Sequence, residues 1–391
     1  MSLPVIVLAG GGTGGHVFPM IAVGDALRAE ADVRVVYIGT ARGIESRVVP
    51  ERGDDLEVLD IVPIKGGGVR GALRGISRAA MSLPRARSLV KRLSARAVLA
   101  VGGYAAGPVG LAAWSARVPV AIHEPNHALG LANRWLLPFA RRAYVAFADT
   151  ATKMRPGVAV RTGVPLRGSF LPVAYAPHAG RFHVLVLGGS QGAKALNEIV
   201  PPSLADAGDD IDGLTVVHQA GRGREDETRR RYAELGMSGR ASVVPFLDDV
   251  ATELARADLV IQRAGASSLA ELCAIGRPSI LIPFPFAADD HQQKNAEALA
   301  FSGAAIVVSQ ADATVDRLAG QVVSLAKDER RRMDMAAAAQ AQGRPDAART
   351  VARDLLALAG LAQRSGNPSA EGTGELRVGK NGKSGLEVAR V

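Results

Sequence analysis

Short apolar runs alternate with helical patterns through the first half of the chain. Each run is rich in Val, Ile and Leu, and helical stretches such as 16–30 and 107–117 separate the runs. Continuous apolar strands with helices between them are typical of a parallel sheet covered on both faces. The runs that we predict as strands are 4–9, 33–38, 57–62, 97–101, 119–123 and 143–147.

The second half of the chain shows the same alternation. Its predicted strands are 183–187, 214–218, 241–246, 259–262, 278–283 and 304–308. Helical stretches follow at 314–328 and 329–361. Two doubly wound α/β domains are the simplest packing for this order of elements. The pattern therefore predicts two Rossmann-like domains, each built on a parallel sheet.

The boundary between these domains is expected at 164–181, where three prolines interrupt the pattern. We therefore predict an N-terminal domain over 1–163 and a C-terminal domain over 182–361. The last helix of the second domain is also able to pack back on the first. Residues 362–391 lack apolar periodicity and are rich in Gly and Ser, which predicts a disordered tail.

Composition and charge narrow the expected partners without naming a function. The net charge of +9 favours anionic partners such as phosphates and lipid headgroups, although solvated surface charge explains part of it. No recognition-helix, zinc-finger or RNP-type signature is present, so we expect no nucleic-acid partner. The single cysteine, Cys273, fits a reducing compartment and the apolar face of a helix.

The chain shows no targeting or membrane-spanning pattern. Its N-terminal apolar run lacks a basic leader and breaks at Gly10, which argues against a signal peptide. No run of about 18 apolar residues is present that could cross a bilayer. We expect a cytosolic protein that is peripheral to a membrane at most.

The turn after the first predicted strand reads "GGGTGGH" over 10–16. It fits G-x-G-x-x-G, the fingerprint of a dinucleotide site, which also requires an acid at the end of the second strand. That strand ends "YIGTARG" with no acid at its tip, so a nicotinamide or flavin site is not expected. No Walker motif is present either.

Two more glycine loops follow predicted strands, at 102–108 and 188–193. A strand, a glycine turn and a helix N-terminus together make an anion site, because the backbone N–H groups can approach a phosphate closely. Each loop alone is more often a tight turn, but three of them favour a cleft between two sheets. His16 begins the first helix, where it is either a neutral general base, a phosphate ligand or a turn residue.

Further polar groups follow other predicted strands. These polar residues, which lie at or after the ends of predicted strands, are His123, Glu124, Asn126, His127, Glu271, Asp290, Gln292, Gln293 and Asn295. They fit the edge of a substrate site, and each alone fits the polar start of a helix. No metal-ligand spacing is present, and the pair Asp289 and Asp290 is only a weak candidate.

Eight motifs in this order resemble the MurG family, the UDP-N-acetylglucosamine transferases that complete lipid II in peptidoglycan synthesis. They are "GGTGGHVFP", "GGYAAGP", "HEPN", "TGVPLR", "GGSQGAKALN", "FLDDV", "RAGASSLAE" and "DDHQQKNA", spread over residues 4 to about 360. The resemblance implies a GT-B fold and transfer of GlcNAc from UDP-GlcNAc to the muramoyl 4-hydroxyl of lipid I, with inversion. It implies no catalytic metal and no other cofactor.

The resemblance also implies roles for residues of the first domain. His16 is the expected base, and Thr13, Gly14 and Gly15 border the acceptor diphosphate and the transferred sugar. Asn126 is expected to contact the GlcNAc. The second loop, with Gly102, Gly103 and Tyr104, is expected to face the acceptor.

In the second domain the implied residues all contact the donor. Leu247 offers backbone groups to uracil, Glu271 takes the ribose hydroxyls, and Gln292 and Gln293 hold the GlcNAc. The residues expected near the nucleotide and its phosphates are Arg167, Ser190, Ala266, Ser267, Ser268 and Leu269. The turn "RAGASSLAE" departs from the "RSGA-x-T-x-SE" of much of the family in the positions of its hydroxyl groups.

A lipid-linked acceptor implies contact with the cytoplasmic face of the cell membrane. The expected patch is part of 69–96, where basic and apolar residues alternate. Basic residues beside apolar ones suit a membrane with anionic headgroups. Its candidate residues are Leu73, Ile76, Leu83, Arg85 and Arg87, with Val90 and Leu93 following. The alternative is an ordinary surface helix, with Trp114 and Trp135 serving the membrane instead. Cell-wall synthesis or division proteins are further expected partners.

Three other functions stay open from the residues alone. The first is a GT-B glycosyltransferase with another acceptor. The second is a UDP-GlcNAc 2-epimerase, which needs further catalytic carboxylates in the cleft. The third is a nucleotide-sugar binding module without activity, which does not explain a histidine in the first glycine loop.

Overall fold

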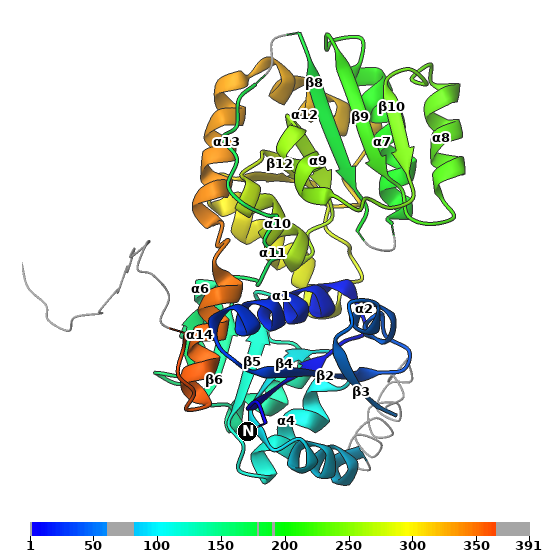
Figure 1. Cartoon of the computed structure of the whole chain (residues 1–391). Helices are drawn as coiled ribbons and strands as arrows, with labels where there is room; N and C mark the ends of the chain where they lie inside the picture. The colour runs from blue at the N-terminus through cyan, green and yellow to red at the C-terminus, as the bar shows by residue number, and fades with distance from the viewer. Residues whose placement is uncertain (1, 61–81, 178–179, 190–191, 365–391) are drawn as a thin grey trace, which may run out of the picture.

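The computed structural model describes residues 2–60, 82–177, 180–189 and 192–364. The chain forms two parallel sheets, one above the other in Figure 1, with helices on both faces of each. This is the GT-B-like, two-domain α/β architecture that the strand pattern predicts, so the predicted fold class is confirmed.

The first sheet has seven parallel strands in the order β3-β2-β1-β4-β5-β6-β7. They are β1 (Val5–Gly10), β2 (Arg34–Thr40), β3 (Asp55–Leu59), β4 (Ala95–Gly102), β5 (Val120–Glu124), β6 (Arg142–Val145) and β7 (Ala159–Arg161). This strand order is that of a doubly wound sheet. In such sheets, ligands bind beyond the carboxyl ends of the strands.

The helices and short turns of this domain follow its strands. They are α1 (Gly14–Glu30), α2 (Glu45–Glu51), α4 (Ala106–Ser115), α5 (Leu131–Leu136), η1 (Leu137–Phe139) and α6 (Ala148–Thr152), with residues 82–92 also helical. Strand β1 alternates its side chains between the two faces. Ile6 and Leu8 pack with α1, while Val5 and Val7 pack with α4 and the helical 82–92 segment.

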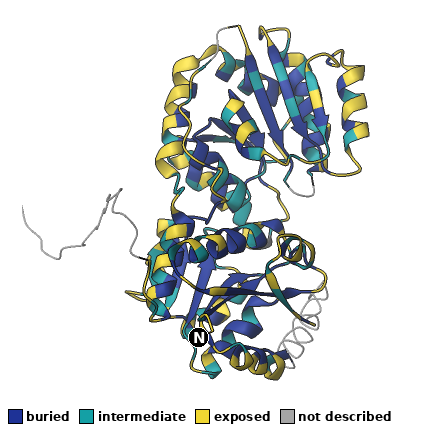
Figure 2. Cartoon of the chain, viewed as in Figure 1, coloured by how far each residue is buried: buried dark blue, intermediate teal, exposed yellow. Residues whose placement is uncertain are grey.

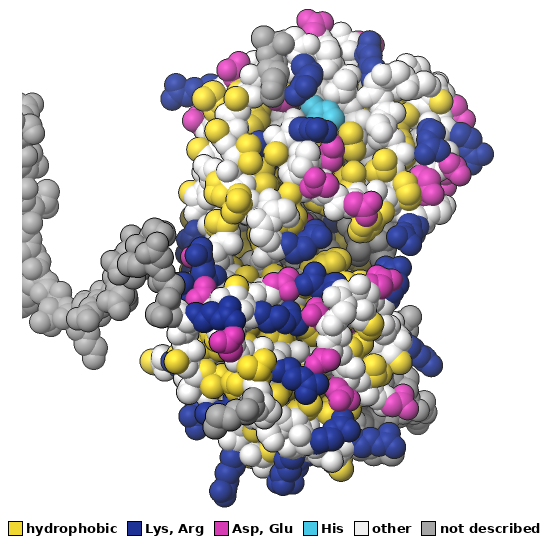
Figure 3. Space-filling model, in the orientation of Figure 1, with side chains coloured by type: hydrophobic (Ala, Val, Ile, Leu, Met, Phe, Trp, Pro, Cys, Tyr) yellow, Lys and Arg dark blue, Asp and Glu magenta, His cyan; other side chains and the backbone are white. Residues whose placement is uncertain are grey.

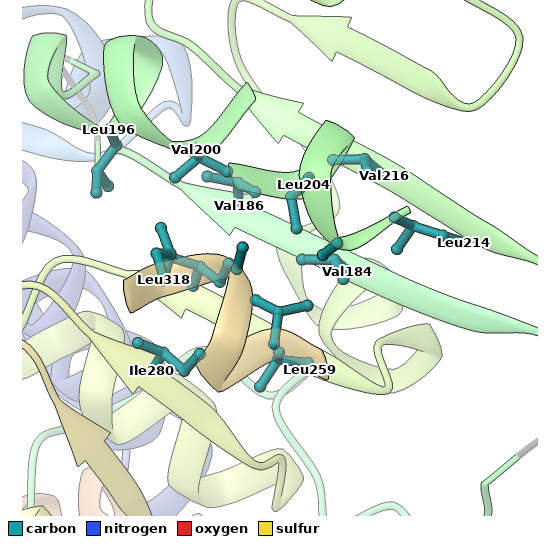
Figure 4. Packing of buried hydrophobic residues seen from close by; sticks show 14 of the residues in the cluster. Val184, Val186, Leu196, Val200, Leu204, Leu214, Val216, Leu259, Ile280 and Leu318 are labelled. Carbon is teal, nitrogen blue, oxygen red and sulfur yellow. The ribbon is translucent and has the colours of Figure 1, made fainter. Parts of the chain in front are cut away.

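The second sheet has six parallel strands in the order β10-β9-β8-β11-β12-β13. They are β8 (Phe182–Leu187), β9 (Leu214–Gln219), β10 (Ala241–Val244), β11 (Leu259–Gln262), β12 (Ser279–Leu281) and β13 (Ala305–Val307). Figure 4 shows one side of its core, where Val184 and Val186 of β8 meet Val200 and Leu204 of a covering helix.

The helices of the second domain cover both faces of that sheet (Figure 2). They are α7 (Lys194–Ala207), α8 (Glu225–Glu234), α9 (Val250–Arg256), α10 (Ala266–Ile275), η2 (Ala288–Asp290), α11 (His291–Phe301), α12 (Val315–Lys327) and α13 (Glu329–Gln342). Cys273 is buried in this core, as its place on an apolar helix face predicts.

The predicted helical stretch 329–361 is wrong as a single unit. It forms α13 and a separate helix, α14 (Ala347–Leu358), because Gly343 and Pro345 interrupt it. The strand β7 has no apolar run that predicts it, and its residues are only partly buried.

Helix α14 lies against the first domain, beside α1 (Figure 1). Its apolar face, with Val351 and Leu355, is buried in the core that also holds Leu8 and Val17. Asp354 accepts hydrogen bonds from Tyr144 Oη (2.8 Å) and Arg142 Nε (3.1 Å). The chain thus crosses from the first domain to the second and returns to the first.

Several sequence-based predictions concern residues outside those that the structure describes. They are Leu73, Ile76, Ser190 and the part of the predicted tail from 365 onward. Arg364 is described, and its backbone N–H donates to the Glu30 carbonyl (2.7 Å) on the first domain.

Candidate active site

The carboxyl ends of the two sheets face each other, with α1, α10 and α11 between them (Figure 1). In Figure 3 the molecule narrows between the two domains at this level. Several polar contacts between described residues cross the gap. Ser267 Oγ donates to the Gly15 carbonyl (3.3 Å), the His127 N–H donates to Asn295 Oδ1 (3.0 Å), and Arg134 pairs with Asp289 (2.6 Å). The motif residues of both domains therefore meet at one junction.

The first two glycine loops pack directly on each other. The Gly11 N–H donates to the Gly102 carbonyl (3.3 Å), and a Cβ on Gly103 would lie 2.2 Å from the Gly11 carbonyl oxygen. Gly103 also has a φ of +82°, where a side chain is strained. The glycines are thus required for close approach of two backbones at the start of α1 and α4.

The His16 ring lies in the floor formed by these loops. A Cβ on Gly102 would be 2.7 Å from its Cδ2, and its Nδ1 is buried with no hydrogen-bond partner among the described residues. Burial lowers the pKa of His16, and the His291 ring acts in the same direction. The Gly11 backbone and the Glu45 carboxylate oppose that shift. A neutral imidazole at pH 7 suits a general base.

An acid does lie at the tip of β2, which corrects the expectation that none is present. Glu45 reaches back from α2, and its buried carboxylate accepts from Gly12 N (2.8 Å), Thr40 N (2.9 Å) and Thr40 Oγ1 (3.0 Å). Its oxygens lie where a Cβ on Gly11 or Gly43 would be. Because these donors occupy the carboxylate, Glu45 holds the loop together and offers no oxygen to a cofactor ribose.

The loop after β5 is organised by a buried carboxylate. Glu124 accepts from the Asn126 N–H (3.0 Å), the Asn126 Nδ2 (3.1 Å), the Gly130 N–H (2.7 Å) and Asn133 Nδ2 (2.9 Å). Burial raises its pKa, and these four donors oppose the shift. Glu124 therefore shapes the loop, and Asn126 at its tip lies at the domain junction.

His123 does not lie at a substrate-binding edge. Its ring is buried, and burial lowers its pKa to about 4. His127, by contrast, is only partly buried, and its Nε2 lies 3.3 Å from Asp149 Oδ2. Of the two histidines in this motif, His123 belongs to the core and His127 to the junction.

The turn after β11 leads into α10. Ala266 and Leu269 are buried in the domain, while Ser267 and Ser268 are partly exposed at the helix N-terminus. Free N–H groups at such a terminus attract an anion. Ser267 touches Gly15, so this terminus lies beside the first glycine loop and His16.

Glu271 lies one turn further along α10, near Arg167 of the linker. Burial raises the pKa of Glu271 to about 7, and Arg167 opposes that shift. The Arg167 guanidinium lies over the rings of Phe18 (5.2 Å) and Phe170 (5.7 Å). Arg167 therefore stands between α1 of the first domain and the acid of the second.

The two glutamines of α11 face different partners. Gln292 Oε1 accepts from the Ala264 N–H (3.2 Å) and the Phe284 N–H (3.0 Å), which fixes the turns after β11 and β12. Gln293 Nε2 donates to Glu297 on the same helix (2.8 Å). Both glutamines lie at the junction, as the predicted site requires. Gln292 Oε1 and Gln293 Nε2 are bound to other groups of the protein.

The third glycine loop and the turn after β10 lie at the far end of the same edge. Gln219 Nε2 donates to the Gly189 carbonyl (3.0 Å). Leu247 is partly buried, and the residue before it, Phe246, is an exposed aromatic. The Arg222 guanidinium lies 5.9 Å from the Phe246 ring. Sequence reasoning missed Phe246, although an aromatic beside "LDD" at a strand tip was visible as a stacking surface for a base.

Tyr104 and Thr13 are the exposed members of the first-domain loops. Tyr104 is 39% exposed and follows Gly103, and Thr13 precedes α1 without capping it through its side chain. Both side chains are thus accessible at the glycine loops of the first domain.

Metal ligation finds no support in the geometry of the described residues. Among them, no three His, Cys, Asp or Glu side chains come together as a metal site requires. A cavity of about 540 Å³ lies elsewhere, at the amino ends of β8, β9 and β10, and contains none of the motif residues.

Two family models match this chain and define its class. The glycosyltransferase family 28 N-terminal domain matches residues 6–145, and the family 28 C-terminal domain matches residues 183–351. With two facing parallel-sheet domains, the chain is a glycosyltransferase of the GT-B class.

Closer relatives specify the family. A UDP-N-acetylglucosamine–N-acetylmuramyl-(pentapeptide) pyrophosphoryl-undecaprenol N-acetylglucosamine transferase of Sorangium cellulosum is 59% identical over 357 residues, covering 90% of this chain and 88% of that protein. The crystal structure of Acinetobacter baumannii MurG is 30% identical with a TM-score of 0.76, covering 90% of this chain and 99% of that one. The chain belongs to the MurG family of transferases.

A more distant likeness concerns the fold alone. A UDP-GlcNAc 2-epimerase from Neisseria meningitidis has a TM-score of 0.63 at 12% identity, covering 91% of this chain and 100% of that one. The two-domain architecture is thus shared with enzymes of another class, and the activity must be argued from the site.

Proposed function

We propose that this chain transfers GlcNAc from UDP-GlcNAc to the muramoyl 4-hydroxyl of lipid I, forming lipid II with inversion at the anomeric carbon. The observation that carries the proposal is the contact between Ser267 and Gly15. It brings the N-terminus of α10, whose free N–H groups suit an anion, next to His16, whose pKa is lowered. A base and a leaving-group site on opposite domains suit one displacement step.

In the proposed reaction His16 takes the proton of the acceptor 4-hydroxyl. The acceptor oxygen attacks the anomeric carbon from the face opposite UDP, and the bond to the β-phosphate oxygen breaks. Negative charge then grows on the leaving phosphate. The N–H groups at the start of α10, near Ala266, Ser267 and Ser268, are placed to stabilise that charge.

The donor is proposed to lie along the edge of the second sheet. Uracil contacts the Leu247 backbone and the Phe246 face, the ribose hydroxyls bind Glu271, and Arg167 and Ser190 lie near the phosphates. The GlcNAc hydroxyls are assigned to Gln292, Gln293 and Asn126. The exposed Phe246 ring and the acid beside Arg167 support this order.

The acceptor diphosphate is proposed to bind on the first domain. Thr13, Gly14 and Gly15 begin α1, and Gly102, Gly103 and Tyr104 form the neighbouring loop. We expect no metal requirement, since the N–H groups of two helix ends can bind two phosphates. Turnover should therefore persist in excess chelator, and a loss restored by a divalent cation would contradict this.

Membrane contact is proposed at the first domain, on the cytoplasmic face. No described helix has the length and apolar character to cross a membrane. Of the predicted patch, Arg85 and Arg87 are exposed, whereas Val90 is buried and Leu83 packs against the core. The expectation of apolar contacts from Val90 is therefore wrong, because the apolar face of this helix covers the sheet.

Exposed aromatic residues elsewhere on this domain can supply the apolar part. Trp114 is 49% exposed and lies 4.5 Å from the Phe139 ring, and Trp135 is 57% exposed. Tryptophan is enriched at membrane interfaces because its ring is apolar with one polar N–H. Partners from cell-wall synthesis or division stay a prediction.

One assay tests the proposed activity. Purified protein is incubated with UDP-GlcNAc and a lipid I analogue in detergent, and the products are identified by mass spectrometry. We expect a disaccharide-lipid and free UDP. Donor binding without that product, or formation of an epimerised nucleotide sugar, would contradict the proposal.

A further inference from the structure

Asn295 is a buried polar side chain to which the proposed reaction assigns no role. It lies on α11 and is fully buried at the domain junction. Its Oδ1 accepts from the His127 N–H of the first domain (3.0 Å). Its Nδ2 donates to the Ala264 carbonyl of the second domain (3.3 Å) and to Asn126 Oδ1 (3.3 Å). One amide therefore joins both domains.

Two backbone groups fix which way this amide points. The His127 N–H can only donate and the Ala264 carbonyl can only accept. The oxygen of Asn295 must therefore face the loop after β5, and its nitrogen must face the turn after β11. An amide that is bound at both ends by groups of different domains is satisfied only when those domains are together.

The hydrogen bonds continue on each side of Asn295. In the first domain, Asn126 Nδ2 donates to the buried Glu124 carboxylate (3.1 Å). In the second, Gln292 accepts from the Ala264 N–H (3.2 Å), so two side chains one turn apart on α11 hold both backbone groups of Ala264. The network thus runs from the tip of β5 to the turn that begins α10.

That turn also sets the position of the proposed anion site. Ser267 follows Ala264 by three residues and donates to the Gly15 carbonyl, beside His16. Any change in the turn at Ala264 moves the start of α10 relative to the first glycine loop. The alignment of base and leaving group therefore depends on the contact that Asn295 makes.

We propose that Asn295 is a positioning residue, which couples closure of the two domains to alignment of the α10 N-terminus with His16. Asn126 acts in part through Asn295, in addition to its assigned contact with the sugar. The inference rests on the proposed function, because the geometry that it sets is that of the transfer step.

The test is a double-variant cycle with Asn126→Ala and Asn295→Ala in the full chain. We expect each single variant to lower kcat by about tenfold, since each leaves a buried partner unsatisfied. The double variant should lose no more than about twofold beyond the worse single variant, because the two residues act as one unit. Losses that multiply would overturn the coupling.

Two further readouts separate positioning from loss of folding. In Asn295→Ala the affinity for UDP-GlcNAc, measured by calorimetry, should change by less than about threefold, while small-angle scattering should show a larger donor-bound radius of gyration than in the unchanged chain. Asn295→Asp keeps the volume and the acceptor for His127 but places an oxygen against the Ala264 carbonyl, so it should reproduce the kcat loss. Full kcat in Asn295→Asp would overturn the proposal.

Arg134→Ala supplies a matched control at the same junction. It removes another side-chain pair between the domains, whose members are 48% and 52% exposed, so kcat should change by less than about twofold. An equal loss in this variant would overturn a special role for Asn295. A chain that binds donor and closes but forms no disaccharide-lipid would contradict the proposed function alone.

Discussion

At the level of single residues, burial decides what the candidate groups can do. His16 and Glu271 are both enclosed by the protein, and burial disfavours the charged form of each. The result is a neutral imidazole and a carboxyl group that titrates near pH 7. Both states follow from the junction between the domains and suit a base and a ribose ligand.

The first prediction concerns the base. His16→Ala should lower kcat by about 10²- to 10⁴-fold, because a positioned general base contributes that much to a proton transfer. The affinity for UDP-GlcNAc should stay within a few-fold, since the donor contacts lie on the second domain. Steady-state kinetics and calorimetry measure the two effects. Turnover that survives within a few-fold would make His16 a structural residue.

The second prediction concerns pH. The pKa of Glu271 is raised to about 7 in the free chain, so its charged form, the better acceptor for ribose hydroxyls, is lost as the pH falls below about 7. The affinity for UDP-GlcNAc should therefore weaken by about tenfold in total between pH 8 and pH 6. Glu271→Gln should bind more weakly at pH 8 and lose most of this dependence. An unchanged slope in that variant would assign it to another group.

At the level of elements, the loops after the strands carry the site, and their glycines have separate reasons. Gly102 leaves room for His16, Gly103 for the Gly11 backbone, and Gly192 for the Ala220 carbonyl, 2.1 Å from where its Cβ would lie. Anion binding is one reason for such loops, and close packing of neighbouring loops is another. The structure shows the second directly.

The third prediction uses two glycines of one loop. In Gly103→Ala the new Cβ would lie 2.2 Å from the Gly11 carbonyl, and the φ of +82° is strained, so thermal unfolding should come earlier by several degrees. Gly107→Ala adds a Cβ to α4 with no atom within 4 Å, and it should be neutral or stabilising by up to about 1 kcal/mol. Calorimetry compares the two; equal melting temperatures would contradict the packing argument.

At the level of the whole molecule, two separate sheets face each other at their carboxyl ends, and α14 connects the second domain back to the first. Because α14 returns to the first domain, residues near 350 stabilise the domain that begins the chain. The exposed Arg85 and Arg87 lie on another part of the first domain, the helical segment 82–92. The first domain thus carries both one side of the junction and these basic residues. It can therefore meet a lipid-linked acceptor.

The fourth prediction tests that surface. Arg85→Glu combined with Arg87→Glu should weaken binding to vesicles that contain anionic lipid by at least tenfold, since each basic residue near such a surface contributes about 1 kcal/mol. A pair with the same net charge change on the second domain, Arg330→Glu with Arg331→Glu, should bind as the unchanged chain does. Vesicle sedimentation measures both, and equal loss in the two pairs would reduce the effect to net charge.

Most strands were visible in the sequence because a strand buried on both faces must be apolar throughout. β1, β8 and β11 lie within a residue of their predicted bounds for this reason. β7 was not visible, since it is a three-residue strand at the edge of the sheet, with two partly buried residues and one exposed residue. The break between α13 and α14 coincides with "GRP", where glycine and proline interrupt the helix.

The candidate site divides in the same way. Glycine loops, His16 and the amide-rich start of α11 are local patterns, and sequence spacing is enough to find them. The roles of Glu45 and Asn295 are not local, because each acts on a backbone group far away in the chain: Glu45 on Gly12, and Asn295 on His127. No spacing rule predicts which distant N–H group a buried polar side chain will meet.

The chain's amino acids alone thus specify two parallel-sheet domains, their glycine loops and the family, since these depend on local periodicity and short motifs. The folded molecule adds what depends on contacts between distant segments. It buries the Nδ1 atom of His16, fills the tip of β2 with the Glu45 carboxylate, and sets the Asn295 amide between two domains. Burial and hydrogen-bond pairing arise only when the sheets are packed, and so the chemistry of these groups was decided there.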